Sequence, residues 1–110
     1  MKTVFVYMTT GSMEEAQAIG SALVKERLAA CVNIIEGMTS IFEWEGKIDS
    51  AKETILIAKT TTERFDELEE RVIELHSYDL PCIVALPVAK GHTPFLNWIG
   101  ESVKGASCQT

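Results

Sequence analysis

Residues 31–60 read CVNIIEGMTSIFEWEGKIDSAKETILIAKT, and this stretch decides the fold. Apolar residues recur with a period of two over residues 31–44, which predicts one strand, and a second strand follows over 48–60. Glu45-Gly46 lies between them and is typical of a tight hairpin turn. Gly37 interrupts the first strand where a residue without a Cβ favours a bulge or bend. The stretch therefore predicts one long antiparallel hairpin whose apolar halves pair with each other.

The predicted hairpin is longer than the body that should carry it. The 14 residues of its first strand span roughly 45 Å at about 3.3 Å each, whereas a chain of 110 residues should form a globule only about 35 Å across. The tip therefore overhangs, and it carries Ile41, Phe42, Trp44 and Ile48. Apolar side chains beside unpaired strand edges promote aggregation unless another chain covers them. We therefore expect a homo-oligomer in which these four residues contact neighbouring subunits.

The segments on either side of the hairpin complete a split sheet. Before the hairpin, the sequence predicts an apolar strand over 3–9 and a helix that is capped by Ser12 and Glu15 and runs to about Leu28. After the hairpin, it predicts a helix opened by residues 60–63 and closed by His76, and then a strand over 80–88. A last helix has Thr93 as its N-cap and Pro94 at its first position. Pro81 and Pro87 place the last strand at a sheet edge. With right-handed crossovers, this order predicts an α+β, ferredoxin-like antiparallel sheet with two helices on one face and an extra C-terminal helix. We expect one domain over 1–104 and a flexible tail over 105–110.

Composition and charge exclude several classes of protein. The chain has 10 Lys+Arg against 16 Asp+Glu, a net charge of −6, and it lacks the basic clusters that bind nucleic acid. Its apolar runs are far shorter than the ~18 to 20 residues that span a bilayer, and no signal peptide is evident. The three cysteines, Cys31, Cys82 and Cys108, have no CxxC spacing, which predicts free thiols. We therefore expect a cytoplasmic protein with no nucleic-acid or membrane partner.

The motifs of other ferredoxin-like proteins are missing from the sequence. An RNA-recognition module needs aromatic residues on its middle strands, whereas the strand over 53–60 reads ETILIAKT. The first strand-to-helix turn offers only Thr10-Gly11-Ser12, with no phosphate-binding glycine motif and no CxxC. Ser-His-Asp, HExxH and zinc-ribbon spacings are also missing. The sequence therefore predicts no enzymatic activity.

Seven short motifs resemble the CutA divalent-cation tolerance family. They are RLAACVN (27–33), GMTSI (37–41), WEGKI (44–48), KT (59–60), HSY (76–78), ALP (85–87) and LNW (96–98). The resemblance covers nearly the whole chain in order. It implies a ferredoxin-like homotrimer, similar in assembly to the nitrogen-regulatory PII proteins, that is linked to tolerance of copper and other divalent ions and catalyses no known reaction.

Metal ligands are one kind of site that this resemblance implies. The copper ligand of the family falls on His76, and other ligands fall near Met8 and on Leu75, which cannot bind a metal. Cys82 replaces an acid of the family pattern, and its thiol would favour Cu(I). With Cys31 added, the metal candidates are His76, Cys31, Cys82 and Met8, and copper or another divalent cation is not expected to be obligatory. The alternative is structural: His76 complements the dipole of its helix, and the sulfur side chains fill the core.

A second kind of site would hold a small anion. Lys59, Asn33, Tyr78 and Trp98 are polar or amphipathic residues at strand ends and helix faces, and they could line a cleft between subunits. Aromatic and amide side chains are equally typical of an ordinary interface. The main hypothesis is therefore a non-enzymatic homotrimer that binds metal ions or relays a metal-response signal. The rival hypothesis is a PII-like effector-binding module whose hairpin contacts an unknown protein partner.

Overall fold

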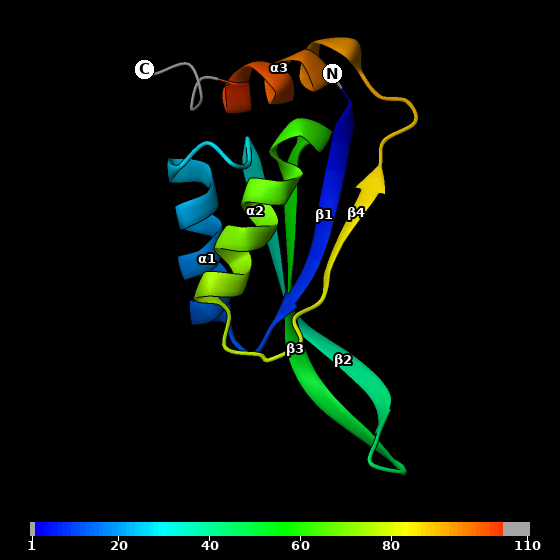
Figure 1. The fold of residues 1–110 in the computed structure, drawn as a ribbon. Helices are drawn as coiled ribbons and strands as arrows, with labels where there is room; N and C mark the ends of the chain where they lie inside the picture. The colour runs from blue at the N-terminus through cyan, green and yellow to red at the C-terminus, as the bar shows by residue number, and fades with distance from the viewer. Residues whose placement is uncertain (1, 105–110) are drawn as a thin grey trace.

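Four antiparallel strands form a single sheet in the order β2-β3-β1-β4. The computed structural model describes residues 2–104, and the expected tail, with Cys108, lies outside them. The elements are β1 (Thr3–Thr10), α1 (Met13–Lys25), β2 (Cys31–Trp44), β3 (Lys47–Thr61), α2 (Thr62–Leu75), β4 (Ile83–Pro87) and α3 (Thr93–Lys104). The split β-α-β-β-α-β order with an added helix is therefore confirmed (Figure 1). Strand β4 lies at an edge of the sheet, as its two prolines predicted.

The two faces of the sheet are covered unequally. Helices α1 and α2 cover one face (Figure 1), where side chains of β1 and β3 such as Val6, Met8 and Leu56 are fully buried. Helix α3 lies across the end of the sheet where β1 begins, and there Ile99 and Val103 pack with Ala30. Much of the second face has no such cover, and it exposes apolar side chains of β2 and β4. The expected arrangement of two helices on one face is confirmed.

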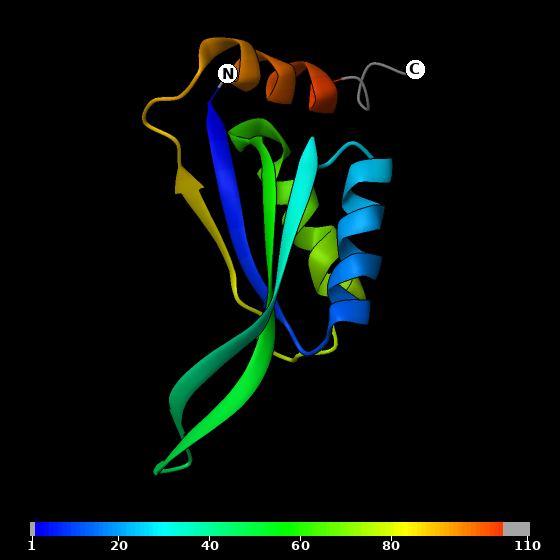
Figure 2. The same ribbon diagram turned by 180° about the vertical axis from the view of Figure 1, so that it is seen from behind.

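The β2–β3 hairpin extends well beyond the rest of the molecule (Figure 2). The molecule measures 48 × 30 × 21 Å, and the hairpin ladder runs from the Cys31–Lys59 pair to the Trp44–Lys47 pair. The turn residues Glu45 and Gly46 both have positive φ, at 52° and 81°, as a type I′ turn requires. A bulge follows Ile35, and Gly37 there has a φ of 89°. The predicted overhang, turn and bulge are thus all present.

Helix α1 ends at Lys25, three residues earlier than predicted. Arg27 adopts a left-handed conformation with φ of 61°. The N–H of Leu28 donates to the carbonyl of Leu23, and the N–H of Arg27 donates to that of Val24. These two bonds form a Schellman motif, which usually uses glycine. The apolar pattern continues past Lys25, so no local signal in the sequence indicates this helix end.

Two other predicted boundaries were wrong. Strand β4 begins at Ile83 rather than residue 80, because Pro81 has no N–H to offer a ladder. Helix α3 begins at Thr93 itself, and the carbonyl of His92 accepts from the N–H of Leu96. Pro94 is tolerated there because the N–H groups of a first helical turn have no partner within the helix. Neither change alters the topology.

Candidate functional site at the base of the hairpin

Polar side chains from three segments converge where the hairpin leaves the body. Glu15 comes from the first turn of α1 and Glu53 from β3. His76 and Tyr78 follow α2, and Cys82 precedes β4. We call these five residues the hairpin-base cluster. They are separated by up to 67 positions in sequence, so only the folded chain brings them together.

His76 is held in the interior by both of its ring nitrogens. Its side chain is fully buried, and Nε2 lies 2.7 Å from the carbonyl oxygen of Thr9. The backbone N–H of Tyr78 donates to Nδ1 across 3.1 Å. Since a carbonyl can only accept, Nε2 carries the proton and Nδ1 is the acceptor, which assigns a neutral tautomer. A metal could reach Nδ1 only by displacing the Tyr78 N–H.

Glu15 joins α1 to the segment that follows α2. Its Oε1 accepts from the N–H of Gly11 at 3.0 Å, and its Oε2 accepts from the N–H of Ser77 at 2.7 Å. Oε2 also lies 3.7 Å from Nδ1 of His76. Burial alone would raise the pKa of Glu15, but the hydrogen bonds donated by Gly11 and Ser77 lower it below its usual value. Glu15 is therefore a charged anchor rather than a proton donor.

Glu53 accepts hydrogen bonds from two hydroxyl groups. The Tyr78 hydroxyl donates to Oε2 at 2.9 Å, and the Ser40 hydroxyl donates to Oε1. Burial and the adjacent Glu53 carboxylate raise the pKa of Tyr78 to about 12. Burial and Glu53 also raise the pKa of the Cys82 thiol. The thiol is therefore protonated near neutral pH, whereas a metal ligand must be a thiolate.

The Tyr78–Glu53 pair can be tested by titration. We expect the chain to show one tyrosine that ionises near pH 12, and Glu53→Gln should lower this pKa because the carboxylate charge is lost. The pKa of Tyr78 is higher in the folded chain than in the unfolded chain, so the unfolded chain loses the proton at a lower pH. The contribution of Tyr78 to stability is therefore complete below about pH 10 and falls as the pH rises toward 12. Absorbance at 295 nm measures ionisation. Tyr7→Phe, which removes the other tyrosine, assigns the signal, and an unchanged Tyr78 pKa in Glu53→Gln would contradict the pairing.

The four metal candidates do not share one site within the chain. Met8 is fully buried in the core, on the strand that also carries Thr9, the partner of His76. Cys82 lies at the same end of the sheet, because the neighbouring Ile83 pairs with Met8. Cys31 pairs with Lys59 at the opposite end. Across residues 2–104, no three His, Cys, Asp or Glu side chains form a group that could hold a metal ion.

The four cleft candidates are likewise split between the two ends of the sheet. The Lys59 ammonium lies 5.3 Å from the ring centroid of Phe5 and 5.5 Å from that of Phe95. Trp98 stacks on Phe95 at 5.8 Å, so Lys59 and Trp98 belong to one aromatic group. Asn33 is exposed and lies beside Ile57 on the same uncovered face. Tyr78 is far from them, in the hairpin-base cluster.

Comparison with known proteins identifies the family. Residues 4–102 match the family model described as CutA1 divalent ion tolerance protein. The chain belongs to the CutA1 family. It is 50% identical over 97 residues to the divalent-cation tolerance protein CutA of Thermus thermophilus, which covers 88% of this chain and 94% of the relative.

Solved CutA1 structures share the fold. The periplasmic divalent cation tolerance protein CutA of Archaeoglobus fulgidus is 46% identical and superposes with a TM-score of 0.89, covering 93% of this chain and 99% of that one. CutA1 of Oryza sativa is 36% identical with a TM-score of 0.92, covering 94% and 95%. The family assignment made from the seven motifs is confirmed. No helix within residues 2–104 is long and apolar enough to cross a bilayer.

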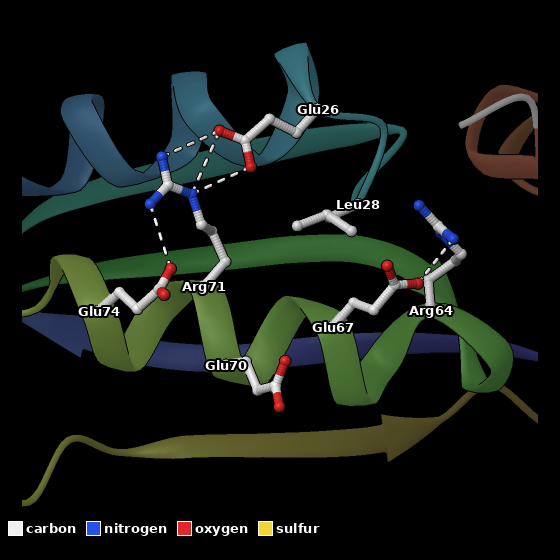
Figure 3. Close-up of a pocket in the computed structure, with 7 residues that line it drawn as sticks. All are labelled: Glu26, Leu28, Arg64, Glu67, Glu70, Arg71 and Glu74. Carbon is white, nitrogen blue, oxygen red and sulfur yellow. Dashed lines mark hydrogen bonds and ion pairs between the residues drawn. The ribbon is translucent and has the colours of Figure 1, made fainter. Parts of the chain in front are cut away.

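This CutA1 chain also has a charged groove that the sequence analysis missed. The groove has a volume of about 310 Å³ and lies between the C-terminal end of α1 and the outer face of α2 (Figure 3). Its lining residues are Glu26, Leu28, Arg64, Glu67, Glu70, Arg71 and Glu74. Arg71 bonds to both carboxylate oxygens of Glu26 and to Glu74, and these carboxylates raise its pKa. The three- and four-residue spacing of charges along α2 was the available signal.

The groove makes a poor chelating site in this CutA1 chain. Arg71 lies between Glu26 and Glu74 and engages both, and Arg64 engages Glu67 at 2.7 Å. Three of the four glutamates that line the groove, Glu26, Glu67 and Glu74, are therefore already paired with guanidinium groups, which leaves too few free carboxylates for a hard cation. The Arg71–Glu26 pair joins α2 to the end of α1, whereas the other two pairs lie within α2 (Figure 3).

Proposed function

We propose that the chain is a non-enzymatic homotrimer that acts in divalent-cation tolerance, either by binding copper or another divalent cation or by relaying a metal-response signal. The observation that carries this proposal is the 50% identity, over 88% of the chain, to a protein named for divalent-cation tolerance. The proposal includes a cytoplasmic location, although the Archaeoglobus relative is described as periplasmic. The free thiols of Cys31 and Cys82 suit a reducing compartment.

The uncovered sheet face supports the oligomer. Leu86 and Val84 of β4 and Ile35 of β2 are 50%, 47% and 51% exposed, and the hairpin tip adds Ile41, Trp44 and Ile48. Both sheet edges, β2 and β4, have a free side within the chain. An apolar face beside open edges is typical of a surface that another subunit covers. Three copies would carry a charge of about −18, three times −6, which attracts cations.

The hairpin-base cluster is the favoured place for a metal. His76 Nδ1 and Glu15 Oε2 lie 3.7 Å apart, so the two atoms could act as ligands once the Tyr78 N–H gives way. Metal sites usually need three or four ligands. The residues present supply only part of such a set, and water or a neighbouring subunit must supply the rest. We therefore expect modest affinity.

Copper titration tests this placement. We expect His76→Ala to weaken Cu²⁺ binding at least about tenfold, because it removes the only imidazole of the cluster. His92→Ala is the matched control, since His92 is exposed and lies in the loop before α3. Calorimetry at pH 7.5 under argon, in a Cys108→Ser background, measures both variants. If Cu²⁺ binding is unchanged in His76→Ala but lost in His92→Ala, the hairpin-base cluster is not the metal site.

A PII-like effector-binding module is the second candidate function. The observation that favours it is the Lys59 ammonium held over Phe5 and Phe95 beside Trp98, an aromatic group with a positive charge at its centre. Such a group suits a flat anionic ligand at a seam between subunits. A ligand that binds the folded state raises its unfolding temperature. Stabilisation by nucleotides, with none by metals, would favour this function.

A further inference from the structure

We propose that the space between α3 and the adjoining end of the sheet is a binding site for a small organic anion, a carboxylate attached to an apolar group. We call it the α3 pocket. It has a volume of about 850 Å³ and is the largest of the described cavities. Its walls come from the start of β1, the junction of β3 and α2, the segment after β4, and α3. The site lies within one chain, and it rests neither on a metal nor on the proposed function.

A buried hydroxyl without a partner marks the pocket. Thr61 is 1% exposed and lines the pocket, and its Oγ1 has no hydrogen-bond partner among residues 2–104. Thr61 is also the N-cap of α2, yet its side chain makes no capping bond. The adjacent Thr60 differs, because its hydroxyl donates to the carbonyl of Leu28 at 2.7 Å. Buried polar groups are almost always paired, so the orphaned Thr61 hydroxyl calls for a polar atom from a ligand.

The charges around the pocket favour an anion. Lys2 lines it, and the backbone of Lys2 is held there because its carbonyl accepts from the N–H of Thr62 at 2.9 Å. The positive end of the 14-residue α2 is at the same place, since Thr62 is its first residue. Glu101 is the acidic lining residue, and it is engaged by Lys104 at 3.0 Å. A cation, a helix N-terminus and an unpaired hydroxyl thus face one space.

The other residues that line the α3 pocket indicate the chemistry of the rest of the ligand. Thr3 pairs directly with Thr61 across the ladder, and Asn97 of α3 adds an amide. Apolar side chains from the end of β4, the segment after it and α3 complete the wall; they are Pro87, Val88, Ala89 and Leu96. Small-molecule sites typically have volumes of about 300–1,000 Å³ and combine apolar walls with a few polar groups. An apolar body with one carboxylate matches this lining.

Benzoate is a suitable probe, with benzyl alcohol and benzamidine as neutral and cationic analogues of the same shape. We expect benzoate to shift the amide resonances of Thr3, Asn97 and Gly100 in ¹⁵N-labelled full-length protein, and the two analogues to bind at least tenfold more weakly. Thr61→Val should weaken benzoate binding about tenfold without loss of stability, because valine keeps the shape and removes only an unpaired hydroxyl. Lys2→Gln should weaken it most at low salt, whereas Lys47→Gln at the hairpin tip should not.

Thr60→Val is the matched control for Thr61→Val. It should destabilise the protein, because it breaks the bond to Leu28, but leave benzoate affinity unchanged in the folded protein. Equal binding of benzoate and benzyl alcohol, or full benzoate affinity in Thr61→Val, would overturn the proposal. So would the absence of shifts at these residues up to 20 mM benzoate, which would mean that the pocket is closed in the assembled protein. A loss of copper binding alone would not contradict the proposal of an anion site in the α3 pocket.

Discussion

Leu86→Asp is expected to convert the proposed trimer into monomers. Leu86 is 50% exposed and lies beside Phe5 on the uncovered face of the sheet. In a closed trimer the substitution occurs three times, so three unpaired carboxylates would be buried at the interfaces. Burying one unpaired charge costs several kcal/mol, which is enough to abolish association at micromolar concentration. Native mass spectrometry should show about 36 kDa, three times 12.1 kDa, falling to the single-chain mass.

A second leucine provides the control for Leu86→Asp. Leu80 is 89% exposed and lies outside the strands, so Leu80→Asp should leave the mass near 36 kDa. Far-ultraviolet circular dichroism separates dissociation from unfolding, because a folded monomer keeps its helical signal. A Leu86→Asp variant that remains trimeric would show that the β4 part of this face lies outside the interface. A wild-type chain of 12.1 kDa in solution would refute the trimer itself.

Glu15→Ala is expected to destabilise the fold by about 2–3 kcal/mol at neutral pH. The substitution removes two charge-assisted bonds and leaves the N–H groups of Gly11 and Ser77 without their acceptor. Urea unfolding at one fixed protein concentration measures the loss, because an oligomer's stability depends on concentration. Glu14→Ala is the matched control, since Glu14 is exposed in the same first helical turn. Glu14→Ala should lower the free energy of unfolding by less than about 0.5 kcal/mol, as is usual for surface positions.

The effect of Glu15→Ala should depend on pH. The folded pKa of Glu15 lies below its unfolded value of about 4.3. Its contribution is therefore complete above that value and is lost as the pH falls through the folded pKa. The stability difference between wild type and Glu15→Ala should be constant from pH 6 to pH 8 and shrink below pH 4. A difference that does not change down to pH 3 would mean that the Glu15 charge contributes nothing.

The sheet could be predicted because its signals are local. The alternation over β2, the Glu45-Gly46 turn and the bulge at Gly37 each lie within a few residues, and they determine the hairpin and its register. The length of the hairpin then predicted the overhang. The end of α1 was missed because it depends on Arg27 accepting a conformation that usually needs glycine. The end of α1 is therefore determined by its tertiary context rather than by the local sequence pattern.

The hairpin-base cluster could be foreseen only in part. His76, Tyr78 and Cys82 were singled out, but Glu15 was noted only as a helix cap and Glu53 as a strand residue. Their bonds join distant positions: Ser77 is 62 residues from Glu15, and Tyr78 is 25 residues from Glu53. Pairings of this kind leave no periodicity in the sequence. The orphaned hydroxyl of Thr61 was equally hidden, since Thr60 beside it is the same residue type and is fully bonded.

The hairpin also affects how the chain is made. Synthesis completes β2 and β3 by residue 61, whereas β4, which covers the other edge of β1, is still to come. A nascent chain therefore presents an apolar arm and an open edge together, before any second subunit can reach it. Charged residues interrupt the arm at Glu43, Glu45, Lys47, Asp49 and Lys52. Such residues discourage strand-to-strand addition, so they should protect the exposed arm of a nascent chain against fibre formation.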